Sequence, residues 1–186
     1  MIRIALIGEI GSGKTFVSKL FNYPVFNADK EVNKIYNSNK ECFRKLNKKF
    51  SNSIKSFPIK KEELTKIINK KNIKTISNIV HPYVRLNLIK FLKKNNKKKY
   101  VVLDIPLLIE NRLNKTEDII VFINTKKKTI EQRLRKRSNY NKKIINILNS
   151  LQLSKKKKIK FSNFIIENNF GKNNLLNQIK KIKKQI

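Results

Sequence analysis

Apolar residues gather in five short runs that are separated by longer stretches with helical spacing. The runs are Ile2–Ile7, Pro24–Asn27, Tyr100–Ile105, Ile119–Ile123 and Asn163–Ile166. Short β-branched apolar runs are typical of strands buried on both faces of a parallel sheet. Strands that alternate with helices predict an α/β fold of three layers, with a five-stranded parallel sheet between helices.

The stretch from residue 30 to residue 95 contains no strand candidate and is too long for a simple crossover. Its periodicity predicts helices at Glu31–Tyr36, Glu41–Phe50, Lys60–Asn69 and Ile73–Lys93. We therefore expect an inserted helical lobe at 30–95 and a second, very basic helical lid at 133–160. The core of this single 186-residue domain would be 1–29, 96–132 and 161–186.

The first run leads into Gly-Glu-Ile-Gly-Ser-Gly-Lys-Thr at residues 8–15, which fits the phosphate-binding pattern Gly-x-x-x-x-Gly-Lys-Ser/Thr. A helical pattern with Val17 and Leu20 follows, so the motif has the strand–loop–helix context that it requires. A chance match is the alternative, but three of the four glycines occupy motif positions. Lys14 would contact the β- and γ-phosphates and the Thr15 hydroxyl would hold Mg2+. The residues expected at the nucleotide are Gly8, Gly11, Ser12, Gly13, Lys14, Thr15 and Phe16, the last through its N–H.

Net charge changes this picture little, although +33 would ordinarily suggest nucleic-acid binding. The excess is mostly Lys, accompanied by abundant Asn and Ile, which indicates drift in an A/T-rich genome. The lysines, including the run at 155–158, are not interleaved with aromatic residues, so we expect a solvated surface and no specific nucleic-acid site. The single cysteine, Cys42, and the absence of a visible signal peptide or a long apolar stretch predict a cytoplasmic protein with no membrane span.

Further landmarks lie in order along the chain. Asn-Ala-Asp ends the second run, Val-His-Pro lies at 80–82, and Asp-Ile-Pro-Leu-Leu-Ile-Glu covers 104–110. Gln-Arg-Leu-Arg-Lys-Arg covers 132–137, and Ile-Ile-Glu-Asn-Asn covers 165–169. With the phosphate loop, the chain resembles the dephospho-CoA kinase family from end to end. The resemblance implies ATP-dependent phosphorylation of the ribose 3′-hydroxyl of dephospho-CoA, with ATP and Mg2+ required. The sequence leaves the oligomeric state open, and we expect a monomer.

The resemblance also assigns roles near the reaction centre. Asp29 follows the second strand and matches the residue regarded as the base; a helix N-cap is the alternative. Asp104 ends the third strand, where an acidic residue holds Mg2+ in phosphate-loop enzymes, or where it could bond loop amides. Arg133 and Arg137 are four apart and would share one helix face over ATP, with Arg137 catalytic; a solvated basic helix is the alternative.

Substrate contacts are expected at His81, Pro106, Leu107 and Glu110, and an adenine contact at Asn168. Each has a structural alternative. His81 could be a satisfied lobe histidine, Pro106 a strand terminator, Leu107 a packing residue and Glu110 a turn cap.

The sequence departs from the family pattern at Glu9, Asn27, Phe16, Ser138 and Phe170. None of them removes the phosphoryl-transfer residues. Two other functions remain open at this stage: a nucleoside-monophosphate kinase or other small-molecule kinase of the same fold, and a basic nucleic-acid-binding protein with a vestigial nucleotide fold.

Overall fold

The computed structural model describes residues 1–137, 140–169 and 171–186, so Ser138 and Phe170 lie outside the described part of the chain. The described chain divides into two compact units. The first comprises Met1–Asn27 and Asn95–Ile186, and the second is Ala28–Lys94. Each unit is described by itself.

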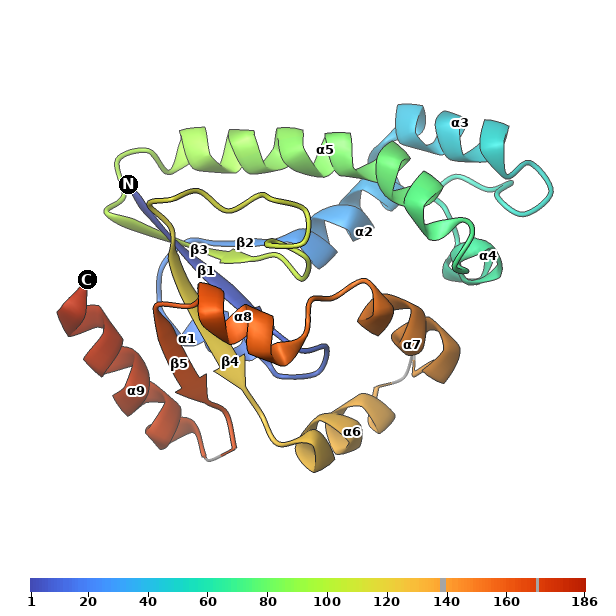
Figure 1. The fold of residues 1–186 in the computed structure, drawn as a ribbon. Coiled ribbons are helices and arrows are strands. Elements are labelled where there is room, and N and C mark those ends of the chain that lie inside the picture. Colours follow the sequence, from blue (N-terminus) through green and yellow to red (C-terminus); the bar gives the residue numbers. More distant parts are fainter. Residues whose placement is uncertain (138–139, 170) are drawn as a thin grey trace. The chain divides into compact units, whose positions relative to one another are not determined.

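The first unit is built on a five-stranded parallel sheet with the order β2-β3-β1-β4-β5 (Figure 1). The strands are β1 (Ile2–Gly8), β2 (Val25–Asn27), β3 (Tyr100–Asp104), β4 (Ile119–Asn124) and β5 (Phe164–Glu167). In this register Leu6 of β1 pairs with Asp104 of β3, and Gly8 pairs with Ile123 of β4. The carboxyl ends of the three central strands therefore meet at one edge, where parallel α/β sheets bind ligands.

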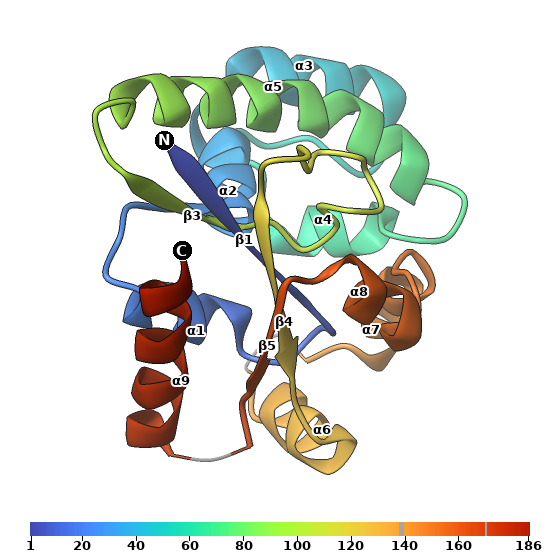
Figure 2. The ribbon, with the colours of Figure 1, turned by 60° about the vertical axis from the view of Figure 1, so that its left-hand side comes forward.

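Helices cover both faces of this sheet, which confirms the predicted three-layer α/β fold. On one face lie α1 (Lys14–Leu20) and α9 (Lys172–Gln185), while α8 (Lys155–Phe161) contacts β1 and β4 on the other (Figure 2). Two further helices, α6 (Lys127–Arg135) and α7 (Lys142–Ser150), follow β4. Asn141 caps α7 and Ser154 caps α8 by accepting backbone N–H bonds through their side chains.

The core between the sheet and α1 and α9 holds the phosphate loop in place. Val17 on α1 and Phe21, the C-cap residue of that helix, are fully buried in this core. From α9, Leu175, Ile179 and Ile182 pack on the same sheet face at helical spacing. Burial of each such side chain stabilises the unit by about 1.5–3 kcal/mol, so the strand–loop–helix junction rests on a rigid base.

The second unit is entirely helical. It contains α2 (Ala28–Ser38), α3 (Lys40–Lys49), α4 (Lys61–Ile67) and α5 (Ile73–Lys94). Its own core is apolar and includes Ile35, Cys42, Leu46, Ile54 and Val80. The Asn39 side chain caps α3 by accepting the Cys42 N–H at 2.8 Å.

Candidate nucleotide-binding site

The loop between β1 and α1 adopts a conformation that only glycines take readily. Gly8, Gly11 and Gly13 have φ values of 152°, 87° and 90°. A Cβ on Gly8 would lie 2.8 Å from the Ile123 carbonyl oxygen, and a Cβ on Gly13 would overlap the Asn168 amide. Gly13 is also the N-cap of α1, so the loop leads directly into a helix N-terminus, where the dipole favours anions.

Lys14 is buried beneath this loop, with 8% of its surface exposed. Its ammonium group donates to the carbonyl oxygens of Gly8 at 3.2 Å and Glu9 at 2.9 Å. Gly8 ends β1 and Glu9 begins the loop. A lysine held there is in position to exchange backbone carbonyls for phosphate oxygens.

The Ser12 carbonyl oxygen joins the loop to three other parts of the first unit. It accepts from the Asn168 amide at 2.7 Å, the Thr125 hydroxyl at 3.0 Å and the Arg133 guanidinium at 3.3 Å. Asn168 follows β5 and is 2% exposed, and Thr125 follows β4. Adenine contact by Asn168 stays a prediction, because in this conformation its amide nitrogen bonds the loop.

Thr15, Asp104 and Asn27 converge at the carboxyl ends of β2 and β3. The Thr15 hydroxyl donates to the Asp104 carboxylate at 2.6 Å, and the Asn27 amide donates to the same oxygen at 2.5 Å. Asp104 is 2% exposed, whereas Thr15 is exposed. A hydroxyl beside a carboxylate supplies the hard oxygen ligands that Mg2+ prefers.

Arg133 and Arg137 occupy different structural settings, contrary to the shared helix face expected from their spacing. Helix α6 ends at Arg135, with Lys136 as its C-cap, so Arg137 lies beyond the helix and is exposed. Its N–H bonds the Leu134 carbonyl at 3.1 Å in a closing turn. Arg133, by contrast, is half-buried and its second nitrogen donates to the Asn168 carbonyl at 3.3 Å.

Phe16 and Asp29, two further residues predicted to lie at the reaction centre, are both found in the first turn of a helix. The Phe16 N–H, expected to face an anion, bonds the Gly13 carbonyl at 3.0 Å in the first turn of α1. Asp29 is exposed in the first turn of α2, which begins at Ala28. It is therefore not at the N-cap position ahead of the helix, although a carboxylate there complements the helix dipole.

In the segment after β3, some of the predicted substrate-contact residues are partly buried by packing and one makes polar contacts. Pro106 and Leu107 are half-buried, while the following Leu108 is fully buried. The Glu110 carboxylate accepts the Leu153 N–H at 2.9 Å and lies 3.3 Å from the Lys158 ammonium. These contacts support the structural alternative for Glu110. Substrate binding by Pro106, Leu107 and Glu110 stays a prediction.

His81 lies in the helical unit, within α5 and directly before Pro82. It is half-buried, and burial lowers its pKa, with the nearby positive charge of Arg85 adding to that shift. A histidine with a lowered pKa is neutral near pH 7 and can accept or donate one hydrogen bond. Among the residues that the structure describes, no cluster of three or more His, Cys, Asp or Glu side chains is arranged to hold a metal ion.

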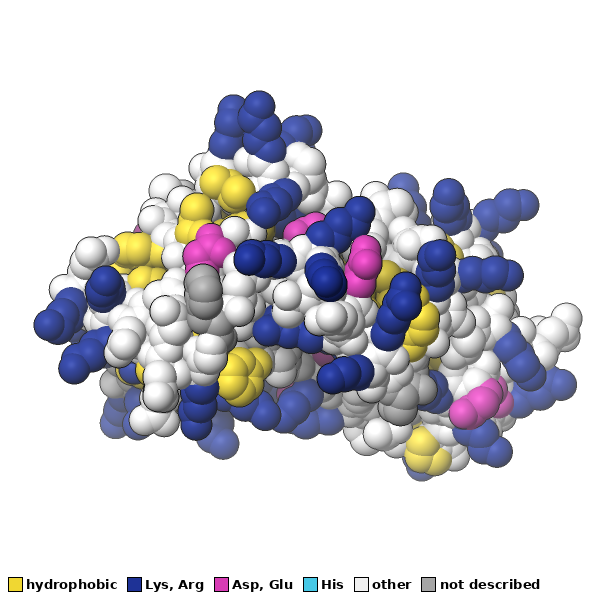
Figure 3. Space-filling view, turned by 90° about the horizontal axis from the view of Figure 1, so that it is seen from below, with side chains coloured by type: hydrophobic (Ala, Val, Ile, Leu, Met, Phe, Trp, Pro, Cys, Tyr) yellow, Lys and Arg dark blue, Asp and Glu magenta, His cyan; other side chains and the backbone are white. Residues whose placement is uncertain are grey.

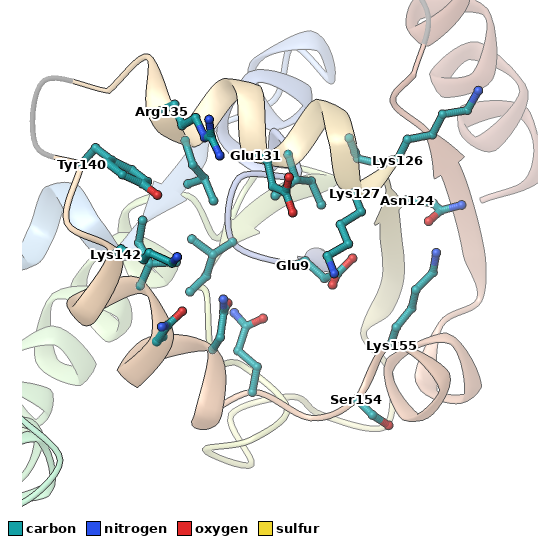
Figure 4. Close-up of a pocket in the computed structure, with 18 of the residues that line it drawn as sticks. Glu9, Asn124, Lys126, Lys127, Glu131, Arg135, Tyr140, Lys142, Ser154 and Lys155 are labelled. Carbon is teal, nitrogen blue, oxygen red and sulfur yellow. The ribbon is translucent and has the colours of Figure 1, made fainter.

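A pocket of about 800 Å³ opens beside the start of the loop (Figure 4). Glu9 and Ile10 line it, together with side chains of α6, α7, the start of α8 and the segments that follow β4, α7 and β5. Its charged lining is mainly cationic: Lys126, Lys127, Arg135, Lys142 and Lys155 against Glu9 and Glu131. Its electrostatics suit an anionic substrate group.

Basic side chains on the visible face in Figure 3 are spread out, with single acidic and apolar side chains between them. This distribution differs from the continuous basic stripe with aromatic platforms that marks single-strand binding proteins. Within the described ranges, the structure contains no helix that is both long and apolar enough to cross a membrane.

Sequence reasoning missed two contributors to the site. Asn27 was considered only as a lost carboxylate, yet its amide bonds Asp104. Lys158 was assigned to a solvated lysine run, yet it is 1% exposed and its ammonium lies 3.4 Å from the Gly8 carbonyl. Nothing in four consecutive lysines indicates which of them faces the core.

A glycine loop between a central parallel strand and a helix, with a buried lysine and a threonine beside an aspartate, defines a phosphate-loop nucleotide-binding protein of the kinase class. Comparison with known proteins narrows the class. The family model described as dephospho-CoA kinase matches residues 2–174. The chain belongs to the dephospho-CoA kinase family and is thus a kinase of coenzyme A biosynthesis.

Individual relatives agree with this assignment. The dephospho-CoA kinase of Wolbachia pipientis wMel is 34% identical, covering 96% of this chain and 95% of its own. The dephospho-CoA kinase of Ehrlichia canis is 32% identical, covering 98% of this chain and 94% of its own. Among solved structures, TT1252 from Thermus thermophilus has a TM-score of 0.80 at 24% identity, covering 100% of this chain and 97% of its own. The Campylobacter jejuni dephospho-CoA kinase has a TM-score of 0.66 at 22% identity, covering 98% of this chain and 96% of its own.

Proposed function

We propose that this chain transfers the γ-phosphoryl group of ATP to the ribose 3′-hydroxyl of dephospho-CoA and releases coenzyme A and ADP. The observation that carries the proposal is the phosphate loop, with Lys14 buried under it and the Thr15–Asp104 pair at its end. Phosphoryl transfer needs positioning and charge neutralisation more than covalent chemistry by the protein. These groups supply both.

On this mechanism Lys14 leaves the Gly8 and Glu9 carbonyls and binds the β- and γ-phosphates. Thr15 and Asp104 would hold Mg2+, whose charge offsets that of the phosphates when it is bound. Arg133 and Arg137 would contact ATP from the lid at 133–160. Arg137 is exposed beyond the end of α6, so its planar guanidinium can turn toward phosphate oxygens.

Asp29 would accept the proton of the attacking hydroxyl. It follows Asn27 by two residues, and Asn27 bonds the proposed Mg2+ ligand Asp104. Asp29 is exposed to solvent in the first turn of α2. The helical lobe at 30–95, with His81 and its apolar helix faces, would bind the rest of dephospho-CoA. The pocket beside Glu9 would attract anionic substrate groups through its lysines.

The test is a mass-spectrometric search for coenzyme A after incubation of the protein with ATP, Mg2+ and dephospho-CoA. AMP, CMP and adenosine serve as competing acceptors in parallel reactions. Preferential formation of coenzyme A supports the proposal. Preferential phosphorylation of AMP or CMP would instead identify a nucleoside-monophosphate kinase of the same fold.

A further inference from the structure

Two lysine ammonium groups converge on one backbone oxygen at the start of the phosphate loop. The Gly8 carbonyl accepts from Lys14 at 3.2 Å and lies 3.4 Å from the Lys158 ammonium. Lys14 is the first residue of α1, whereas Lys158 comes from α8 and lies 150 residues beyond Gly8 in the sequence. Gly8 has a φ of 152° and no space for a side chain, so its carbonyl direction is set by the loop geometry.

Lys158 is held by a complete set of partners. Its three donors meet the Gly8 carbonyl, the Gln152 amide oxygen at 2.9 Å and the Glu110 carboxylate at 3.3 Å. Its side chain is 2% exposed and that of Glu110 is 11% exposed. Glu110 also accepts the Leu153 N–H, so it fixes the segment that leads into α8.

Burial of this ammonium has a cost that an apolar residue would avoid. Burial lowers the pKa of Lys158, while the Glu110 carboxylate opposes the shift. Replacement of a buried ion pair by well-packed apolar residues is often neutral or stabilising. Packing alone therefore does not account for a lysine here, and its position against Gly8 suggests a role in nucleotide binding.

We propose that Lys158 is a positioning residue for the phosphate loop: it keeps hold of the Gly8 carbonyl when Lys14 departs to bind the ATP phosphates. Without Lys158, departure of Lys14 would leave this carbonyl short of a donor, which costs free energy. Lys158 itself does not need to touch ATP.

This inference concerns nucleotide binding, so it can be tested by calorimetric titration of the full chain with ATP and Mg2+, without any acceptor. Lys158→Met should raise the Kd for ATP about tenfold, because a charge-assisted hydrogen bond to the loop is lost. Lys158→Arg keeps a charged donor and should restore most of the affinity. Lys156→Met, an exposed lysine on the same helix, is the matched control and should stay within about twofold of wild type.

A double-mutant cycle with Lys14→Ala distinguishes this positioning role of Lys158 from a merely structural one. If Lys158 acts by holding the Gly8 carbonyl when Lys14 leaves it, Lys158→Met should have little further effect on ATP affinity in a background that lacks Lys14. Full additivity in folded proteins would overturn the proposal, as would unchanged ATP affinity in Lys158→Met. Steady-state kinetics add a second criterion: the KM for ATP should rise while the KM for dephospho-CoA stays within about twofold.

If Lys158→Met does not fold, Glu110→Gln carries the same test. It keeps the shape of the side chain and removes the charge that holds the ammonium in place. Weaker ATP binding in a folded Glu110→Gln protein supports the proposal, and wild-type affinity opposes it. Because ATP binding is measured directly, a protein that binds ATP but makes no coenzyme A would refute the proposed function and leave this inference open to its own test.

Discussion

The Thr15 hydroxyl donates to the Asp104 carboxylate at 2.6 Å, which joins the end of the phosphate loop to the end of β3. A hydroxyl and a carboxylate at this distance can both turn toward one hard cation. The same Asp104 oxygen also accepts from Asn27, so the carboxylate is oriented by neighbours on two elements. This relationship is the basis for the proposed Mg2+ site.

Asp104→Asn tests the site. Loss of the carboxylate should raise the Mg2+ concentration needed for half-maximal activity about tenfold or more, because the amide is a poor Mg2+ ligand. Activity is measured as a function of Mg2+ at saturating ATP. Glu117→Gln, an exposed acidic residue ahead of β4, is the control. An unchanged Mg2+ requirement in Asp104→Asn would assign Asp104 to loop structure only.

Lys14→Ala should reduce turnover at least about a hundredfold, because the developing phosphate charge loses its loop cation. Its ammonium donates to the loop carbonyls of Gly8 and Glu9, whereas the core between the sheet and α1 is built from apolar side chains. The fold should persist, as judged by circular dichroism. The exposed Lys19 on the same helix provides the control, Lys19→Ala. Near-normal turnover in Lys14→Ala would contradict the phosphate-loop assignment.

Asp29→Asn should lower kcat by about 10²–10⁴ while changing ATP affinity little, since a general base acts in the chemical step. The measurement pairs steady-state kinetics with calorimetric ATP binding. Glu62→Gln, exposed in the first turn of α4, controls for loss of a surface carboxylate in the helical unit. A kcat close to wild type would leave Asp29 as a residue that only stabilises the start of α2.

Sheet and loop could be predicted from the sequence because their signals are local. Five apolar runs predicted the five strands to within one or two residues, and glycine spacing predicted the loop. The prediction that Arg133 and Arg137 share one helix face was wrong, because α6 ends at Arg135 and no sequence signal indicated that end. Side-chain partners such as Asn27–Asp104 and Lys158–Gly8 join residues 77 and 150 positions apart, and no local pattern encodes them.

Cys42 gives a pH-dependent prediction in the helical unit. Burial raises the pKa of its thiol to about 11, and the thiol is fully buried. The folded state therefore holds its proton more tightly than the unfolded state, so this stabilisation is present below the unfolded pKa and is lost as the pH rises toward 11. A thiol reagent at pH 8.5 should react slowly with native protein and rapidly after unfolding. Equal rates in both states would show that the thiol is accessible.

The sharpest test of loop geometry compares two glycines of this chain. Gly13→Ala places a side chain at a φ of 90° and against the Asn168 amide, so it should destabilise the protein by about 1–3 kcal/mol and weaken ATP binding. Gly171→Ala meets nothing within 4 Å, at an ordinary φ of −63°. It should change stability by less than about 1 kcal/mol, the range of an N-cap substitution. Denaturant unfolding and calorimetric ATP binding measure both effects. Equal behaviour of the two variants would mean that Gly13 is not constrained by the contacts that shape the phosphate site.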